Sequence, residues 1–247
     1  LMFIFVVGKQ RLPLQALPRV AALGVLGIGV GQVAQTFGVA ANSASVGTTI
    51  SAAIPAFVVV FAALRLKQPV SRLQAVGIVA AFVGIALVAS GRGEATSAAS
   101  QTSLGGAALV LLSALTIAFY YVWSVELTER YGTATVAAWS TLLGFIALLP
   151  WAGWEMSRVP FEMTMTGAAS AAYLGVMVTL LGLFLWLHLL RTIPARIAAS
   201  IQYLQPLIGV AAAATMFGDS LGLLFVAGVI LVLVGLTLTV TNRRKNA

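Results

Sequence analysis

Residues 73–90 read LQAVGIVAAFVGIALVAS, and residues 224–241 read LFVAGVILVLVGLTLTVT. Neither segment contains a charged residue, and each is long enough to cross the hydrocarbon core of a bilayer as a helix. When the two are aligned without gaps, Gly77 and Gly84 fall on two glycines of the second segment. Glycines seven residues apart lie on one face of a helix, where they allow close helix approach. The segments therefore predict a bundle of membrane-spanning helices with an internal repeat.

The composition of the chain supports a membrane protein. Of its 247 residues 60% are hydrophobic and only 8% are charged, whereas a soluble domain is about half apolar and about a quarter charged. So few charges cannot cover the surface of a soluble globule of this size. The apolar content excludes intrinsic disorder, and the absence of Cys excludes a disulfide scaffold or a thiolate metal site.

Eight apolar stretches are long enough to span a bilayer, and their continuous apolar runs favour helices over barrel strands. They are 20–40, 46–64, 73–90, 104–124, 133–151, 167–189, 197–217 and 221–241. The segment 1–7 is apolar but too short to cross. We expect it to be the end of a helix that begins before the given sequence, because no basic region or cleavage site marks it as a signal peptide.

Basic residues concentrate on one side of the predicted membrane. If the loop 8–19 is cytoplasmic, the outer side receives only Arg92 and Arg158 of the 14 Lys and Arg residues. The cytoplasmic side receives Lys9, Arg11, Arg19, Arg65, Lys67, Arg72, Arg130, Arg191, Arg196, Arg243, Arg244 and Lys245. This asymmetry predicts a cytoplasmic C-terminus. Because the cations sit in short loops, they do not indicate nucleic-acid binding, and the pattern suits a bacterial inner membrane.

The internal repeat has an offset of 151 residues and extends beyond the opening pair of segments. Pro55 corresponds to Pro206, and Gly31 corresponds to Gly182. Because five predicted spans separate the matched helices, they cross the membrane in opposite directions, as in the inverted repeats of many secondary transporters. The predicted fold is thus an all-α membrane protein with an inverted five-plus-five helix repeat, here eight full helices plus the end of one more.

The predicted organisation follows from the repeat. Residues 1–90 form a first half that lacks its first helix and most of its second, and 104–241 form the second half. The polar, small-residue segment 91–103 is a linker outside the membrane, and 242–247 is a basic cytoplasmic tail.

The arrangement resembles the EamA-like family of the drug/metabolite transporter superfamily. The motif Gly182-Leu-Phe-Leu-Trp186-Leu-His188, the small-residue helix that reaches Pro206, and Gly218-Asp219 carry the resemblance in the second half. It implies export or exchange of small polar metabolites across an inner membrane, such as amino acids, related compounds or drugs. Alternating access of two halves around a site near the bilayer midplane is the expected mechanism.

Two alternatives stay open at this point: a channel-like or non-transporting membrane assembly subunit, and a membrane-embedded lipid enzyme. A channel would favour rings of charge or a filter loop, and an enzyme would need a convergent acid, base or metal cluster. The sequence has no such pattern, so we expect no enzyme activity, cofactor or metal. The expected partners are the lipid bilayer, a small-molecule substrate and, as an open option, a second copy in a homodimer.

Polar residues at membrane depth are the candidate substrate contacts, because an unpaired amide or hydroxyl there is costly. The alternative is hydrogen bonding between helices. The candidates are Gln32, Gln35, Ser51, Tyr120, Trp186, Gln202, Tyr203 and Gln205.

Pro55 and Pro206 each remove a backbone hydrogen bond near the middle of a predicted span. They are candidates for helix breaks that line a site or for a gating role, and the alternative is a simple packing kink. No carboxylate lies near the bilayer centre, so the candidate proton sites are His188 and Glu126, with a structural hydrogen-bonded histidine as the alternative for His188.

The predicted topology can be tested with a cysteine placed at Ala247, because the sequence contains no other cysteine. We expect a membrane-impermeant thiol reagent to modify this residue only after intact cells are permeabilised. Modification from outside intact cells would contradict the predicted orientation.

Overall fold

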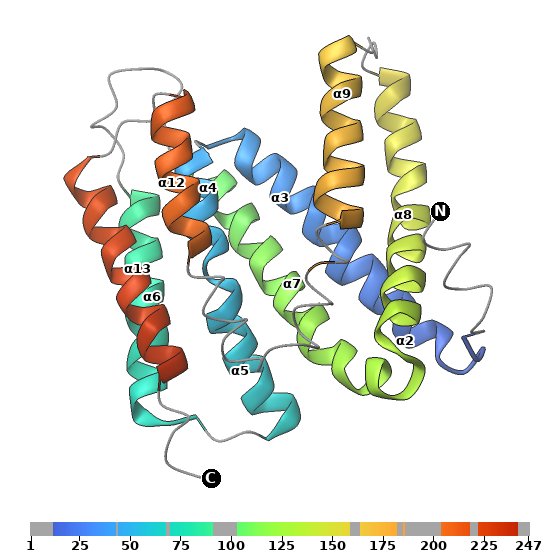
Figure 1. The fold of residues 1–247 in the computed structure, drawn as a ribbon, viewed down its shortest axis with the longest axis horizontal. Coiled ribbons are helices and arrows are strands. Elements are labelled where there is room, and N and C mark those ends of the chain that lie inside the picture. Colours follow the sequence, from blue (N-terminus) through green and yellow to red (C-terminus); the bar gives the residue numbers. More distant parts are fainter. Residues whose placement is uncertain are drawn as a thin grey trace.

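The computed structural model describes residues 12–42, 44–67, 70–90, 103–158, 164–181, 185, 204–217 and 222–241. The described residues form helices and turns, and no strand occurs among them (Figure 1). Five of their helical segments are long and apolar enough to cross a membrane: Leu17–Ala40, Ala44–Arg65, Arg72–Ala89, Leu104–Tyr131 and Thr133–Arg158. The prediction of an all-helical membrane protein is therefore confirmed. The count of eight full spans stays a prediction, since 167–189 and 197–217 are described only in part.

The first long helix contains a π-helical segment. It consists of α2 (Leu17–Ala22), the π-helical η1 (Leu23–Val30) and α3 (Gly31–Ala40), which follow one another without a break. Segment η1 reads LGVLGIGV, and glycine weakens the preference of a chain for regular α geometry. The helix ends where the Asn42 side chain donates to the Gly38 carbonyl at 2.7 Å.

The second predicted span is interrupted in the middle. It forms α4 (Ala44–Ser51) and α5 (Ile54–Leu66), with Ala52 and Ala53 in a tight turn between them. Pro55 stands in the first turn of α5, where its missing N–H and fixed φ are tolerated. Helix α5 ends at Lys67, which has a φ of 53° and so adopts the left-handed conformation of a helix C-terminus.

The next three helices are α6 (Arg72–Ser90), α7 (Leu104–Tyr131) and α8 (Thr133–Arg158). The Ser103 side chain caps α7 by accepting a hydrogen bond from the Gly106 N–H at 3.2 Å. With 28 residues, α7 is about 42 Å long, so its ends project beyond a hydrocarbon core of about 30 Å. Gly132, with a φ of 84°, makes the turn into α8.

The remaining described helices are α9 (Met165–Tyr173), the π-helical η3 (Leu174–Leu181), α12 (Leu204–Phe217) and α13 (Leu223–Thr241). Two of these elements reproduce earlier ones at the offset found in the sequence. Segment η3 begins and ends 151 residues after η1, and α13 begins and ends 151 residues after α6. The local backbone conformation, a π-helical segment included, thus recurs at matched positions.

Helices α6 and α13 lie side by side and antiparallel, in contact at their glycines (Figure 1). A Cβ atom on Gly77 would lie 2.5 Å from the Gly235 carbonyl oxygen, and a Cβ on Gly84 would lie 2.6 Å from that of Gly228. Any side chain at these positions would force the backbones apart. The glycines that reveal the repeat are therefore the residues that bring the two helices together.

Glycines also join helix 17–40 to α7 and α8. A Cβ on Gly27 would meet Tyr120 at 2.6 Å, a Cβ on Gly31 would meet Thr116 at 2.8 Å, and one on Gly38 would meet Val110 at 2.7 Å. The contacts of these three glycines move toward the N-terminus of α7 as the glycine number rises, so the two helices are antiparallel. Gly24, in the π-helical segment, instead faces the backbone of Ser140 and Gly144 in α8.

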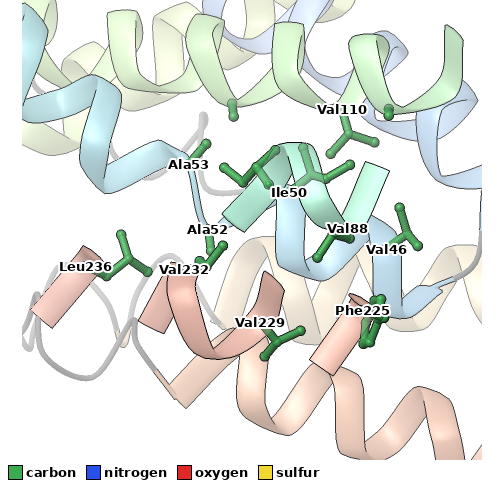
Figure 2. Packing of buried hydrophobic residues seen from close by; sticks show 13 residues of the cluster. Val46, Ile50, Ala52, Ala53, Val88, Val110, Phe225, Val229, Val232 and Leu236 are labelled. Carbon is green, nitrogen blue, oxygen red and sulfur yellow. The ribbon is translucent and has the colours of Figure 1, made fainter. Parts of the chain in front are cut away.

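The largest buried cluster lies between α4, α6, α7 and α13 (Figure 2). Helix α4 contributes Val46 and Ile50, and Val88 and Val110 pack on them from α6 and α7. Phe225, Val229, Val232 and Leu236 come from α13. Since lipid is as apolar as these side chains, close packing rather than removal from water holds the cluster together.

The glycine contact between α6 and α13 predicts the effect of a bulky substitution. We expect Gly228→Leu to lower the folded yield of the full-length protein, because its Cβ would lie 2.7 Å from Val88 and 2.8 Å from the Gly84 carbonyl. Gly153→Leu is the matched control, since nothing lies within 4 Å of a Cβ there. The measurement is the monodisperse fraction in size-exclusion chromatography, and equal yields of the two variants would contradict the packing argument.

Candidate functional site

Two predicted site residues meet at the interruption of the second span. The Gln35 side-chain amide in α3 donates a hydrogen bond to the Ser51 hydroxyl at 3.1 Å. Ser51 is the last residue of α4, is 8% exposed, and donates its own hydroxyl proton to the Gly47 carbonyl at 2.8 Å. Two polar side chains that the sequence predicts at membrane depth are thus paired with each other across two helices.

The backbone at this point lacks one hydrogen-bond donor of a regular helix. The hydrogen bonds of the turn run from the Ala52 N–H to the Thr49 carbonyl at 3.2 Å and from the Ala53 N–H to the Ile50 carbonyl at 2.9 Å. Pro55 has no N–H to donate to the carbonyl one turn earlier, that of Ser51. Gln35, the Ser51 hydroxyl and the Ser51 carbonyl therefore lie at one helix break, where they can accept and donate hydrogen bonds to a polar solute.

The other described candidates do not join this group. Gln32 is exposed, and its carbonyl accepts a hydrogen bond from Thr36 at 2.9 Å. The Tyr120 hydroxyl lies 3.1 Å from the Ser140 hydroxyl of α8. Because Ser140 donates to the Ala137 carbonyl, Tyr120 is the donor in this pair. Tyr120 therefore links α7 to α8 and lies against Gly27. This contact does not include Gln35 or Ser51.

Glu126 lies far from the helix break, near the C-terminal end of α7. Its carboxylate lies 3.2 Å from the Arg65 guanidinium of α5 and 3.7 Å from the Arg19 guanidinium of α2. Its side chain is 63% exposed. Three helix ends thus meet at one acidic residue.

A series of aromatic rings connects the region of the break to this charged end. Phe57 contacts Phe82 with ring centroids 5.1 Å apart, and it stacks on Phe61 at 6.4 Å. Phe61 meets Trp123 edge-on at 5.4 Å, and Trp123 lies 4.6 Å from Phe119. These contacts hold α5 against α6 and α7 through aromatic side chains.

Several candidates lie outside the described residues or are described only in backbone. Gln205 and Pro206 stand in the first turn of α12, and their side chains are not described. Trp186, His188, Gln202 and Tyr203 fall outside the described residues. Within the described part of the chain, no three His, Asp or Glu side chains are grouped so that they could hold a metal ion.

Three contacts of the structure were not predicted from the sequence: the ion pairs of Glu126, the Tyr120–Ser140 pair, and the bond from the Ser103 N–H to the Asn42 side-chain oxygen at 2.8 Å. A signal was present for the first. Arg19, Arg65 and Glu126 are all predicted at the cytoplasmic ends of their helices, where opposite charges can meet.

Comparison with known proteins identifies the family. The family model for the EamA-like transporter family matches residues 1–90 and 104–241, which is most of the chain. The chain belongs to the EamA-like transporter family. The residues outside the two matched ranges are 91–103 and 242–247.

Three relatives of this EamA-like chain are named as a transporter, an efflux pump and an exporter. An uncharacterized transporter of Archaeoglobus fulgidus is 28% identical over 97% of this chain and 83% of its own length. A probable amino-acid metabolite efflux pump of Salmonella typhimurium is 26% identical over 98% of this chain and 81% of its own length. A probable terminal-alkyne amino-acid exporter of Streptantibioticus cattleyicolor is 26% identical over 86% of this chain and 69% of its own length. Family and relatives together indicate a multi-pass membrane transporter rather than an enzyme.

The Tyr120–Ser140 pair predicts a measurable contribution to stability. We expect Tyr120→Phe to lower the free energy of unfolding by about 0.5–1.5 kcal/mol, the value of one hydrogen bond. The measurement is the Tm of the full-length protein in detergent. Tyr121→Phe is the control, because Tyr121 is 40% exposed and makes no hydrogen bond through its hydroxyl to any residue that the structure describes. Equal Tm values for the two variants would contradict a structural role for Tyr120.

Proposed function

We propose that this EamA-like protein is a secondary transporter that exports or exchanges small polar metabolites, amino acids or related compounds, by alternating access. The observation that carries the proposal is the polar helix break, where Gln35 and Ser51 meet beside the interruption at Ala52 and Ala53. Broken helices with unpaired backbone groups form the substrate sites of several transporter folds. The names of two relatives, as an amino-acid metabolite efflux pump and an amino-acid exporter, favour amino-acid substrates.

The substrate contact follows from the hydrogen bonds at the break. Without a solute, the Gln35 amide donates to the Ser51 hydroxyl, which donates in turn to the Gly47 carbonyl. A solute with both a carboxylate and an ammonium group can replace this bond, because the carboxylate accepts from the Gln35 amide while the ammonium donates to the Ser51 hydroxyl oxygen and the Ser51 carbonyl. Because the exchange leaves no group unpaired, it costs little, and a solute that lacks these groups leaves the amide or hydroxyl unsatisfied.

An inverted repeat of five helices in each half is part of the proposal. Two observations support it: the recurrence of helix bounds at an offset of 151 residues, and the contacts of α6 with α13. Gly77 faces Gly235, the repeat counterpart of Gly84, and Gly84 faces Gly228, the counterpart of Gly77. Such reciprocal contacts between antiparallel helices are expected around a two-fold axis in the membrane plane.

The helix packing bears on which segments move in the transport cycle. Helix 17–40 belongs to the first half, whereas α7 and α8 belong to the second, yet glycines bring the three into close contact. Interlocked backbones of this kind resist separation. We therefore propose that these three helices stay together, and that motion takes place in α5, which has fewer buried residues than α4.

The remaining residues predicted from the sequence keep their proposed roles. Gln32, Tyr120, Trp186, Gln202, Tyr203 and Gln205 are proposed as further substrate contacts, Pro206 as a second helix break, and His188 and Glu126 as proton sites. We also propose an inner-membrane location with a cytoplasmic C-terminus, on the charge asymmetry of the loops. A homodimer is compatible with the proposal and is not required by it.

Solute flux tests the proposed function directly. The full-length protein in proteoliposomes should exchange internal for external radiolabelled amino acids, tested as a panel, at a rate that saturates with concentration. Ion conductance in a planar bilayer without saturable exchange would favour the channel alternative. Absence of both with monodisperse protein would contradict the transporter proposal for these substrates.

The polar helix break predicts the effect of removing its amide. We expect Gln35→Ala to weaken the apparent affinity for the transported solute roughly 5- to 150-fold, since a lost buried hydrogen bond costs about 1–3 kcal/mol. Thr36→Ala is the control, because Thr36 is exposed and its hydroxyl bonds to the backbone of its own helix. The half-saturating concentration in the exchange assay is the measurement, and similar values for both variants would contradict the assignment.

A further inference from the structure

The charged cluster at Glu126 joins two helix ends that differ in how firmly they are held. We propose that Glu126 and Arg65 form a latch that holds the end of α5 against α7, and that the protein opens on this side of the membrane when Arg65 leaves Glu126. Arg19 is the positioning residue that keeps the Glu126 carboxylate in place. The proposal rests on the alternating-access function proposed above, because only a protein with moving helices needs a latch.

Helix α5 is less buried than α4, which precedes it. In α4, before the interruption, six residues are buried: Ser45, Val46, Gly47, Thr49, Ile50 and Ser51. In α5, after the interruption, only Ala56 is buried among residues 54–65. The turn at Ala52 and Ala53 uncouples the two helices, because no regular α-helical ladder of hydrogen bonds crosses it. Helix α5 can therefore swing about this point while α4 stays in the core.

Helix α7, which carries Glu126, is packed firmly against helix 17–40. Helix α7 has 28 residues without interruption, and the glycines of helix 17–40 pack against it along its length. Val20 and Leu23 are buried with Leu127, next to the charged cluster. Arg19 and Glu126 therefore sit on helices that are fixed to each other, whereas Arg65 sits on a helix with one buried residue between 54 and 65.

The ion pair between Arg65 and Glu126 is exposed and therefore weak. The Arg65 side chain is 48% exposed and that of Glu126 is 63% exposed, so water weakens their attraction. An exposed ion pair of this kind shifts an equilibrium by roughly two- to fivefold. A contact of this strength biases the closed position and still lets the cycle proceed. A fully buried pair would be far more costly to separate.

The contact between the Phe61 and Trp123 rings separates together with the ion pair of Arg65 and Glu126. Phe61 lies one turn before Arg65 on α5 and meets Trp123, which lies one turn before Glu126 on α7. When α5 swings away, the carboxylate loses Arg65 and the Trp123 ring loses Phe61 in the same motion. Side chains of α7 just below Glu126 then become accessible to water.

A single cysteine on α7 reports the state of the latch. Val122 lies four residues before Glu126, on the same helix face, and is 4% exposed. We would introduce Val122→Cys in the full-length protein, with any cysteine outside the given sequence replaced by Ser. The measurement is its rate of modification by a membrane-impermeant maleimide in inside-out and right-side-out vesicles.

We expect Glu126→Gln and Arg65→Gln each to speed modification of the Val122→Cys reporter about two- to fivefold, from one side of the membrane only. High salt should speed it in the unaltered latch, because salt screens exposed ion pairs. Glu129→Gln is the matched control, since Glu129 lies on the same helix end and pairs with no cation among the described residues. Equal rates for Glu126→Gln and Glu129→Gln would overturn the latch.

A charge reversal separates a latch from a loss of folding. In an Arg19→Gln background, Arg65→Glu places two carboxylates together and should speed modification further. Addition of Glu126→Arg restores the opposite pair, and the rate should return to that of the background. Failure of this rescue in protein that elutes as a monodisperse peak would overturn the latch. The assay needs no transport, so it stands apart from a negative result in the flux assay.

Discussion

Close backbone contact at glycine is the interaction on which the arrangement of this bundle depends. Between helices in lipid there is little to gain from the removal of apolar surface from water, so association depends on packing and hydrogen bonds. Glycines in α6 and α13 bring carbonyl oxygens to positions that a side chain would occupy, and glycines of helix 17–40 do the same against α7 and α8. Once these backbones are in contact, the register of every neighbouring side chain is determined.

Regular helices satisfy their own backbone groups, so departures from regular geometry in a membrane need a partner or a purpose. The described residues contain such departures at η1, at η3 and between α4 and α5. At the last of these, Gln35 supplies a side-chain partner to Ser51, and the turn uses hydrogen bonds to Thr49 and Ile50. The polar groups of the candidate site and the mechanical weak point of the helix are therefore the same feature.

Much of the helical pattern was predictable from local sequence, because apolar run length and caps act over a few residues. Helix α7 begins at Leu104 and α13 ends at Thr241, as the apolar runs indicate. Composition did not reveal the end of α7 at Tyr131, because its last two turns are polar and extend the helix beyond the bilayer. Nor did it separate α4 from α5, since Pro55 alone fits both a kink and a full interruption.

Partner choice at the candidate site was less predictable than its residue types. Glutamine and serine at membrane depth indicate polar pairing, but only the packing of α3 on α4 decides that Gln35 meets Ser51. Tyr120 is a second example, because only the packing of α7 on α8 decides that its hydroxyl meets Ser140. Long-range contacts of this kind depend on register, which a single sequence does not specify.

The π-helical segment η1 has a consequence for the phase of its helix. In a regular α-helix, Gly24, Gly27 and Gly31 would share one stripe, yet Gly24 faces α8 while the other two face α7. The wider turns of η1 change the rotation between the two ends of the helix. Glycines of the same helix can therefore pack against both α7 and α8. Loss of a single residue within 23–30 would turn the N-terminal end by about 100° relative to the rest. Arg19 would then point away from α7, so an insertion or deletion here would alter the charged end of the bundle although no charged residue had changed.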